Sequence, residues 1–79
     1  MEIIILGTGC TRCKNLEMAT RQAIFEMGID AVVSKEEDIV KIMQYGVMQT
    51  PGLVINGKVV SSGRLLTNSQ IKEIITKNL

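Results

Sequence analysis

The hydrophobic pattern of the N-terminal third predicts a strand followed by a long helix. Residues Ile3–Leu6 form an uninterrupted apolar run, which is typical of a strand buried on both faces of a sheet. After Gly7–Gly9, apolar residues recur at three- and four-residue steps from Thr11 to Met27, the spacing of one helix face. Gly28 then stands where a left-handed C-terminal cap is expected.

The middle of the chain predicts a second strand and a second helix. Asp30–Val33 has the composition of a short strand. Ser34 and Glu37 have the spacing of a capping box, and we expect the helix that they open to end at Gly46. Because a helix follows each of the first two strands, we expect these strands to pair in parallel through right-handed crossovers.

The C-terminal third predicts a hairpin and a final helix. Leu53–Ile55 and Lys58–Val60 flank Asn56-Gly57, a strong signal for a two-residue type I′ turn. Thr67–Gln70 is another capping box, and apolar residues follow it at helical spacing. The order is therefore β-α-β-α-β-β-α. It predicts an α/β fold, a four-stranded mixed sheet with helices on both faces, in a single domain over residues 1–79.

Composition excludes several classes of function. Apolar residues make up 46% of the chain, which is incompatible with disorder, and no apolar run approaches the roughly 20 residues that span a membrane. Glu2 stands where a signal peptide would be basic, so we expect a cytoplasmic protein. The net charge is +1 and the only aromatic residues are Phe25 and Tyr45, which argues against nucleic-acid binding.

The cysteine pair, Cys10 and Cys13, carries the candidate chemistry. A disulfide closing so short a loop stabilises a fold by roughly 2 kcal/mol, against about 4 kcal/mol for a loop spanning most of the chain. Structural disulfides are also rare in the cytosol. Reactivity or metal binding therefore explains the pair better than a structural staple.

The predicted helix gives the two thiols different surroundings. Cys10 lies at its start, where free backbone N–H groups and the helix dipole favour a thiolate, and Cys13 lies one turn inside. Arg12 and Lys14 add positive charge nearby. Three-residue spacing brings the sulfurs close enough to bridge, so Cys13 can resolve a mixed disulfide formed on Cys10. The redox group would be this pair, without a further cofactor.

Two motifs carry a resemblance to a known family. The strand leading into Cys10-Thr11-Arg12-Cys13, together with Tyr45-Gly46-Val47 and Thr50-Pro51-Gly52-Leu53, resembles the thioredoxin superfamily. The match is to its small, glutaredoxin-sized thioredoxin-like proteins of bacteria and archaea, and it covers essentially the whole chain. It implies a thiol–disulfide oxidoreductase that acts on protein disulfides and dithiols and draws electrons from an unidentified reductant.

The resemblance also implies which residues form the site. Cys10 and Cys13 would be catalytic, and the Thr50–Pro51 bond would be cis and packed beside Cys10. The backbone around Thr50 would pair with a substrate peptide, and Gly63 would line the same groove. The residues expected to contact the substrate are Gly9, Thr11, Arg12, Thr50, Pro51 and Gly63.

Three features depart from the family pattern. Gly9 and Thr11-Arg12 replace the usual tryptophan before the first cysteine and the Gly-Pro between the pair. The apolar first strand lacks the buried acid of thioredoxins, so proton transfer from Cys13 is expected to go through water. Arg64-Leu65 replaces the acidic pair with which glutaredoxins hold glutathione, which argues against glutathione dependence.

Transfer of Cu(I) or another soft metal by the same thiolates is the main alternative function. Small copper chaperones place a similar cysteine loop between their first strand and helix, and two thiolates suit Cu(I). Those domains run β-α-β-β-α-β and end on a strand, whereas this chain is predicted to end on a helix. A redox-inert binding domain is the remaining alternative. We favour the redox function, in a monomer.

Overall fold

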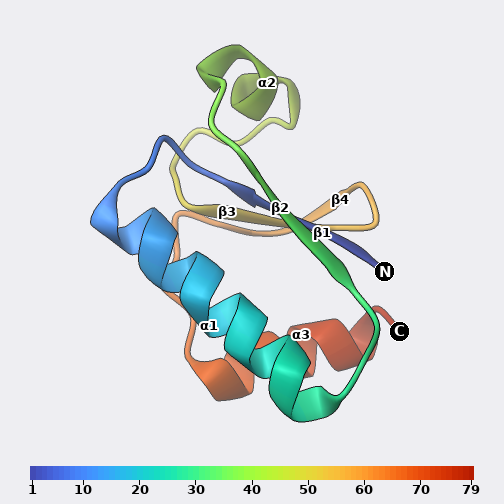
Figure 1. The fold of residues 1–79 in the computed structure, drawn as a ribbon. Helices are drawn as coiled ribbons and strands as arrows, with labels where there is room; N and C mark the ends of the chain where they lie inside the picture. Colours follow the sequence, from blue (N-terminus) through green and yellow to red (C-terminus); the bar gives the residue numbers. More distant parts are fainter.

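The computed structural model describes residues 1–79 and contains seven regular elements in the predicted order (Figure 1). In chain order they are β1 (Glu2–Leu6), α1 (Thr11–Met27), β2 (Val32–Glu36), α2 (Ile39–Gln44), β3 (Gly52–Ile55), β4 (Lys58–Ser62) and α3 (Asn68–Lys77). The predicted α/β fold is therefore confirmed. None of the helices combines the length and the apolar character needed to cross a membrane.

The four strands form one mixed sheet in the order β2-β1-β3-β4. β1 pairs in parallel with β2 and antiparallel with β3, and β3 pairs antiparallel with β4. Leu6, the last residue of β1, lies opposite Gly52, the first residue of β3. This register brings the loop that carries Cys10 and the segment that contains Pro51 to the same end of the sheet.

Helices α1 and α3 pack side by side against one face of the sheet (Figure 1). Their apolar faces and alternate strand residues bury the larger core, which consists of Ile3, Ile5, Leu16, Ala23, Leu53, Ile55, Leu66, Ile71 and Ile75. At the surface Lys72 of α3 pairs with Glu26 of α1. Hydrogen bonds from Gln22 and Lys72 hold the pKa of the Glu26 carboxylate below its ordinary value.

Helix α2 covers the opposite face of the sheet near the end where β1 finishes (Figure 1). There Leu6, Ile42, Val47 and Val54 form a second, smaller core. Helices therefore lie on both faces, as predicted, but the short α2 covers less of its face. The smaller core anchors the segment between α2 and β3. This segment contains Pro51.

The predicted capping box at Ser34 and Glu37 is wrong. Residues 34–36 extend β2, because each pairs with a residue of β1 and the parallel register runs from Val32 to Glu36. Polar side chains are tolerated there because β2 is an edge strand and three of its five residues are exposed. Helix α2 begins later, with Asp38 as its N-cap, and the Asp38 carboxylate accepts a hydrogen bond from the Val40 N–H at 2.9 Å.

The other local signals are confirmed. Gly28 ends α1 in the left-handed conformation, at φ 66°, and donates to carbonyls of the last turn. Asn56 and Gly57 both have positive φ, as a type I′ turn requires. The reciprocal hydrogen bonds of a capping box join Thr67 and Gln70 at the start of α3.

Candidate functional site

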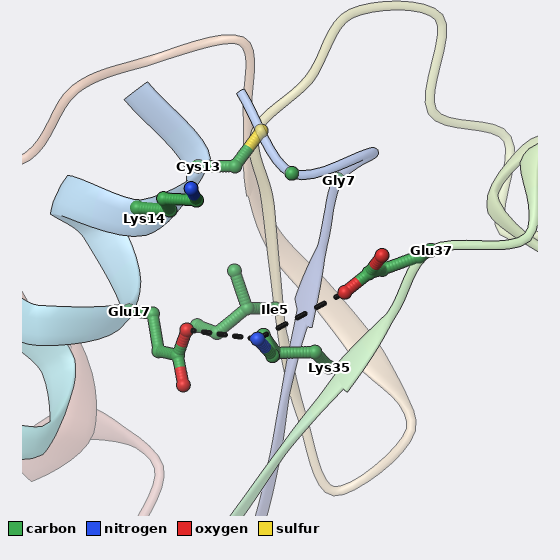
Figure 2. Close-up of a pocket in the computed structure, with 8 residues that line it drawn as sticks. Ile5, Gly7, Cys13, Lys14, Glu17, Lys35 and Glu37 are labelled. Atoms are coloured by element: carbon green, nitrogen blue, oxygen red, sulfur yellow. Dashed lines mark ion pairs between the residues drawn. The ribbon is translucent and has the colours of Figure 1, made fainter. Parts of the chain in front are cut away.

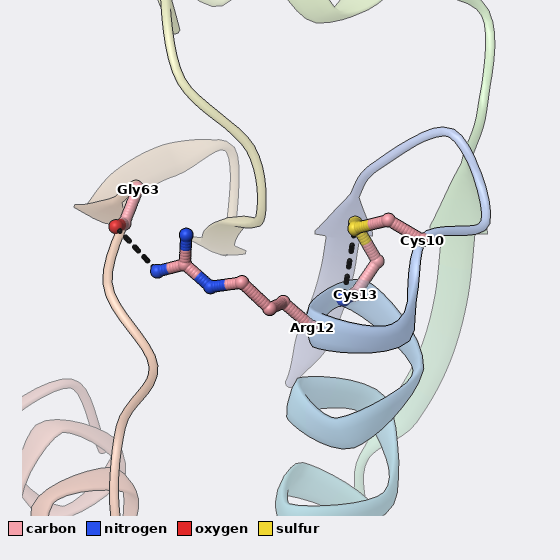
Figure 3. The surroundings of a disulfide bond; sticks show 4 residues. All are labelled: Cys10, Arg12, Cys13 and Gly63. Atoms are coloured by element: carbon pink, nitrogen blue, oxygen red, sulfur yellow. Dashed lines mark hydrogen bonds between the residues drawn. A yellow bond between two sulfur atoms is a disulfide. The ribbon is translucent and has the colours of Figure 1, made fainter.

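Cys10 and Cys13 are joined by a disulfide bond, with their Cα atoms 5.1 Å apart (Figure 3). Cys10 is the N-cap of α1, and its sulfur accepts a hydrogen bond from the Cys13 N–H at 3.1 Å. Cys10 is exposed, whereas only 5% of Cys13 is accessible to solvent. The positions predicted from the sequence, one thiol at the helix start and one shielded a turn inside, are confirmed.

Gly7 makes room for the buried cysteine. A Cβ atom at this position would lie 2.8 Å from the Cβ of Cys13. It would lie even closer to the sulfur of Cys13. The Gly7 N–H donates to the Glu36 carbonyl at 3.0 Å, so the loop cannot easily retreat from the helix. In the sequence, Gly7 marks only the end of the first predicted strand. Its packing against Cys13 depends on the path of the loop, which no sequence pattern shows.

The second side of the site is the segment around Pro51. The Thr50–Pro51 bond is cis, as the resemblance implied, and Pro51 is fully buried. The Pro51 carbonyl accepts a hydrogen bond from the Gly63 N–H at 2.8 Å, which ties this segment to the end of β4. Thr50 itself is half-buried, and neither its N–H nor its C=O is hydrogen-bonded within the protein.

Arg12 connects the two sides of the site (Figure 3). Its guanidinium extends from the first turn of α1 and donates from Nη2 to the Gly63 carbonyl at 3.1 Å. Gly63 in turn donates to Pro51, so a chain of two hydrogen bonds links the cysteine helix to the proline segment. Gly9 and Thr11 are exposed immediately before and after Cys10. The structure therefore brings the six predicted substrate-contacting positions to one end of the sheet.

A polar cavity of about 260 Å³ lies on the other side of Cys13 (Figure 2). It is lined by Ile5, Gly7, Gly9, Cys13, Lys14, Glu17, Lys35 and Glu37. The Lys35 Nζ lies between two carboxylates, 3.6 Å from Glu17 Oε1 and 3.8 Å from Glu37 Oε1. The second carboxylate oxygen of Glu17 accepts a hydrogen bond at 3.1 Å from Arg21, which lies four residues further along α1.

Comparison with known sequences shows to which protein family this chain belongs. The family model described as Thioredoxin domain matches residues 1–76. This chain belongs to the thioredoxin family. It is 38% identical over 76 residues to a thioredoxin from Methanothermobacter thermautotrophicus, covering 96% of this chain and 99% of that protein. It is also 35% identical over 71 residues to a thioredoxin from Methanocaldococcus jannaschii, covering 90% of this chain and 81% of that protein.

The family and the bonded cysteines together identify the activity class. This thioredoxin-family protein is a thiol–disulfide oxidoreductase whose redox group is the Cys10–Cys13 pair. The alternative function in metal transfer is not supported, because the element order and the sheet are those of a thioredoxin-like fold and residues 1–76 match the thioredoxin family model.

Glu17 is a feature of this thioredoxin-family site that is not among the residues predicted above. Glu17 follows Cys13 by four residues and so shares its helix face. That spacing was the available signal. The predicted capping box at Ser34 and Glu37 puts Lys35 at the start of a helix, which gives no reason to expect it beside Glu17. The side chain of Glu17 is only 16% exposed, which puts a shielded carboxylate in the cavity beside the buried cysteine.

Proposed function

We propose that this protein exchanges disulfide bonds with other proteins in two steps, with Cys10 attacking the substrate and Cys13 resolving the intermediate. The observation that carries the proposal is the unequal exposure of the two bonded cysteines. A protein disulfide is bulky and can reach Cys10, whereas Cys13 is 95% buried behind it. Cys10 therefore attacks the substrate first, and Cys13 then attacks Cys10 within the same molecule.

In the first step the Cys10 thiolate attacks one sulfur of the substrate disulfide. A bond forms between Cys10 Sγ and that sulfur, the substrate S–S bond breaks, and the second substrate sulfur leaves as a thiolate that takes a proton from solvent. Cys10 is suited to this role because its sulfur faces the Cys13 N–H at the helix start, which stabilises negative charge there.

In the second step Cys13 loses its proton and attacks Cys10 Sγ. The Cys10–Cys13 bond forms, the bond to the substrate breaks, and the first substrate sulfur leaves as a thiolate. Two electrons have then passed from the protein to the substrate, and a separate reductant must restore the dithiol. We propose that Glu17 accepts the Cys13 proton through water in the shared cavity. Glu17 lies about 5–6 Å from Cys13 between Cβ atoms, as residues four apart on a helix do, and the cavity has room for several water molecules.

The proposed substrate groove runs between the cysteine loop and the Thr50 segment. A buried or half-buried backbone N–H or C=O normally has a partner, and those of Thr50 have none in the protein. An extended substrate segment could supply both hydrogen bonds, as an added strand does at a sheet edge. Gly63 and Arg12 would border this segment on one side. The exposed Met48 offers an apolar contact two residues before Thr50.

The proposed partners are therefore protein disulfides and dithiols, with an unidentified reductant, and we place the protein in the cytoplasm as a monomer. The cytoplasm is a reducing compartment, which would keep the Cys10–Cys13 dithiol available for another cycle.

The proposal is tested by insulin reduction. The purified protein at micromolar concentration, supplied with dithiothreitol, should precipitate reduced insulin chains sooner than dithiothreitol alone. The acceleration should scale with protein concentration, because each molecule turns over many times. A lag time equal to that of the blank at every protein concentration would contradict the proposed function.

Glu17→Gln should slow the second step at neutral pH by at least about 100-fold, the low end of general-base effects. With 5,5′-dithiobis(2-nitrobenzoate), the first thionitrobenzoate released reports attack by Cys10 and the second reports attack by Cys13. Only the second phase should slow. The defect should shrink at high pH, because hydroxide can then remove the Cys13 proton without help from a carboxylate.

The matched control for this variant is Arg21→Gln, which breaks the same ion pair but keeps the carboxylate. It should retain the rate of the second phase. If both variants slow this phase equally, or if the Glu17→Gln defect persists unchanged at high pH, Glu17 acts only through the stability of the helix.

A further inference from the structure

The cations of this protein divide into a paired and an unpaired set. Of nine basic residues, five form ion pairs within 4.0 Å of a carboxylate: Arg21, Lys35, Lys41, Lys72 and Lys77. The remaining four are Arg12, Lys14, Lys58 and Arg64, and all four are exposed. Three of these unpaired cations lie in the segments that form the active site, and only Lys58 lies elsewhere, beside the hairpin turn.

The segments around the groove also lack negative charge. Residues 7–16, 45–52 and 61–70 supply the cysteine loop, the proline segment and the end of β4, and they contain no aspartate or glutamate. The acidic residues outside ion pairs are Glu2, Asp30 and Asp38. Glu2 begins β1 opposite Val32, and Asp30 lies two residues before β2, so both lie at the end of these strands opposite the cysteine loop. Asp38 is the N-cap of α2, and its carboxylate accepts a hydrogen bond from the Val40 N–H.

The positive charge is concentrated on the Gly63 side of the cysteines. On the other side, Lys14 shares its cavity with Glu17 and Glu37, which reduce the local charge. Arg12 and Arg64 form no ion pair with a carboxylate. Arg12 is held by its bond to the Gly63 carbonyl, and Arg64 is the next residue in the chain. We call this pair the basic rim.

We propose that the basic rim selects protein substrates that carry acidic residues beside their reactive disulfide. This inference rests on the proposed function and names its substrate class. One N–H of the Arg12 guanidinium is bound to Gly63 and the group has five in total, so it can still donate to a substrate carboxylate. Its bond to Gly63 also fixes its position, which lowers the entropy lost when the substrate binds. Exposed charges of this kind mainly change the rate of association, and salt weakens their effect.

The test compares two synthetic peptides that contain the same intramolecular disulfide. One carries two aspartates beside its cysteines and the other carries two lysines. Reduced protein is mixed with each peptide, the reaction is quenched with acid, and oxidation of the protein is followed by mass spectrometry after alkylation. At low salt the acidic peptide should react about 3–10-fold faster, as expected for one or two exposed charge pairs, and 0.5 M NaCl should remove most of the difference.

Variants assign the effect to the basic rim. Arg64→Glu should abolish or reverse the preference for the acidic peptide. Lys58→Glu makes the same change of charge at an exposed, unpaired lysine away from the groove, and it should keep the preference. Equal rates for the two peptides, or loss of the preference in both variants, would overturn the inference and leave the proposed function intact. Failure of reduced protein to react with either peptide would instead contradict the proposed function.

Discussion

Cys10→Ser should lower insulin reduction to the rate of dithiothreitol alone and should trap no partner proteins. The reason is geometric, because the thiol of the exposed cysteine is removed and the remaining Cys13, in the first turn of α1, is only 5% accessible. Cys13→Ser should behave differently. Its Cys10 thiolate can still attack, but nothing in the molecule can resolve the mixed disulfide that forms.

The measurement is non-reducing gel electrophoresis of both variants after incubation with a cell extract, followed by treatment with dithiothreitol. Cys13→Ser should give bands of higher mass that dithiothreitol removes, and Cys10→Ser should give almost none. A two-coordinate metal carrier would depend on both sulfurs alike. Equal trapping by the two variants would therefore contradict the assignment of Cys10 as the nucleophile.

Gly7→Ala should destabilise the fold and impair the second step of the reaction. The added Cβ would lie 2.8 Å from the Cβ of Cys13, so either the loop or the cysteine must move. Overpacking of this kind costs about 1–3 kcal/mol, a large share of the roughly 4–12 kcal/mol expected for a domain of this length. Displacement of Cys13 from Cys10 should also slow formation of the bond between them.

Urea unfolding of the oxidised protein and the two phases of thionitrobenzoate release measure these two effects. Thr8→Ala is the matched control, because it changes the next residue in the same loop, which is exposed. It should leave both the urea midpoint and the second phase close to those of the unmodified protein. A Gly7→Ala protein with unchanged stability and an unchanged second phase would contradict this prediction. It would show that the loop can move to accommodate the added Cβ without loss of stability.

The parts of the fold that could be predicted are those set by local chemistry. Gly28 ends α1 because a left-handed cap favours glycine, and Asn56-Gly57 makes the hairpin turn because both residues tolerate positive φ. The boundary between β2 and α2 could not be predicted in this way. Ser34 has the local pattern of a helix cap, but its backbone pairs with β1, and this long-range pairing prevails over the local signal.

The same distinction holds within the site. Cys10, Cys13 and Pro51 could be located from short motifs, because their chemistry is tied to residue type and spacing. The hydrogen bond from Arg12 to Gly63 joins residues 51 positions apart and depends on where β4 ends. The cavity beside Cys13 depends equally on the extended β2, which carries Lys35 to Glu17. Neither feature has a local sequence signal that specifies it.

A single-turnover reaction between the reduced protein and insulin tests the central claim most directly. The protein is reduced, freed of dithiothreitol and mixed with excess insulin. Samples are then quenched with acid and alkylated, and the mass of the protein is recorded over time. The account predicts that both cysteines become resistant to alkylation at the rate at which insulin thiols appear, with the Cys10–Cys13 disulfide as the product. A protein that stays fully alkylatable while insulin keeps its disulfides would contradict it.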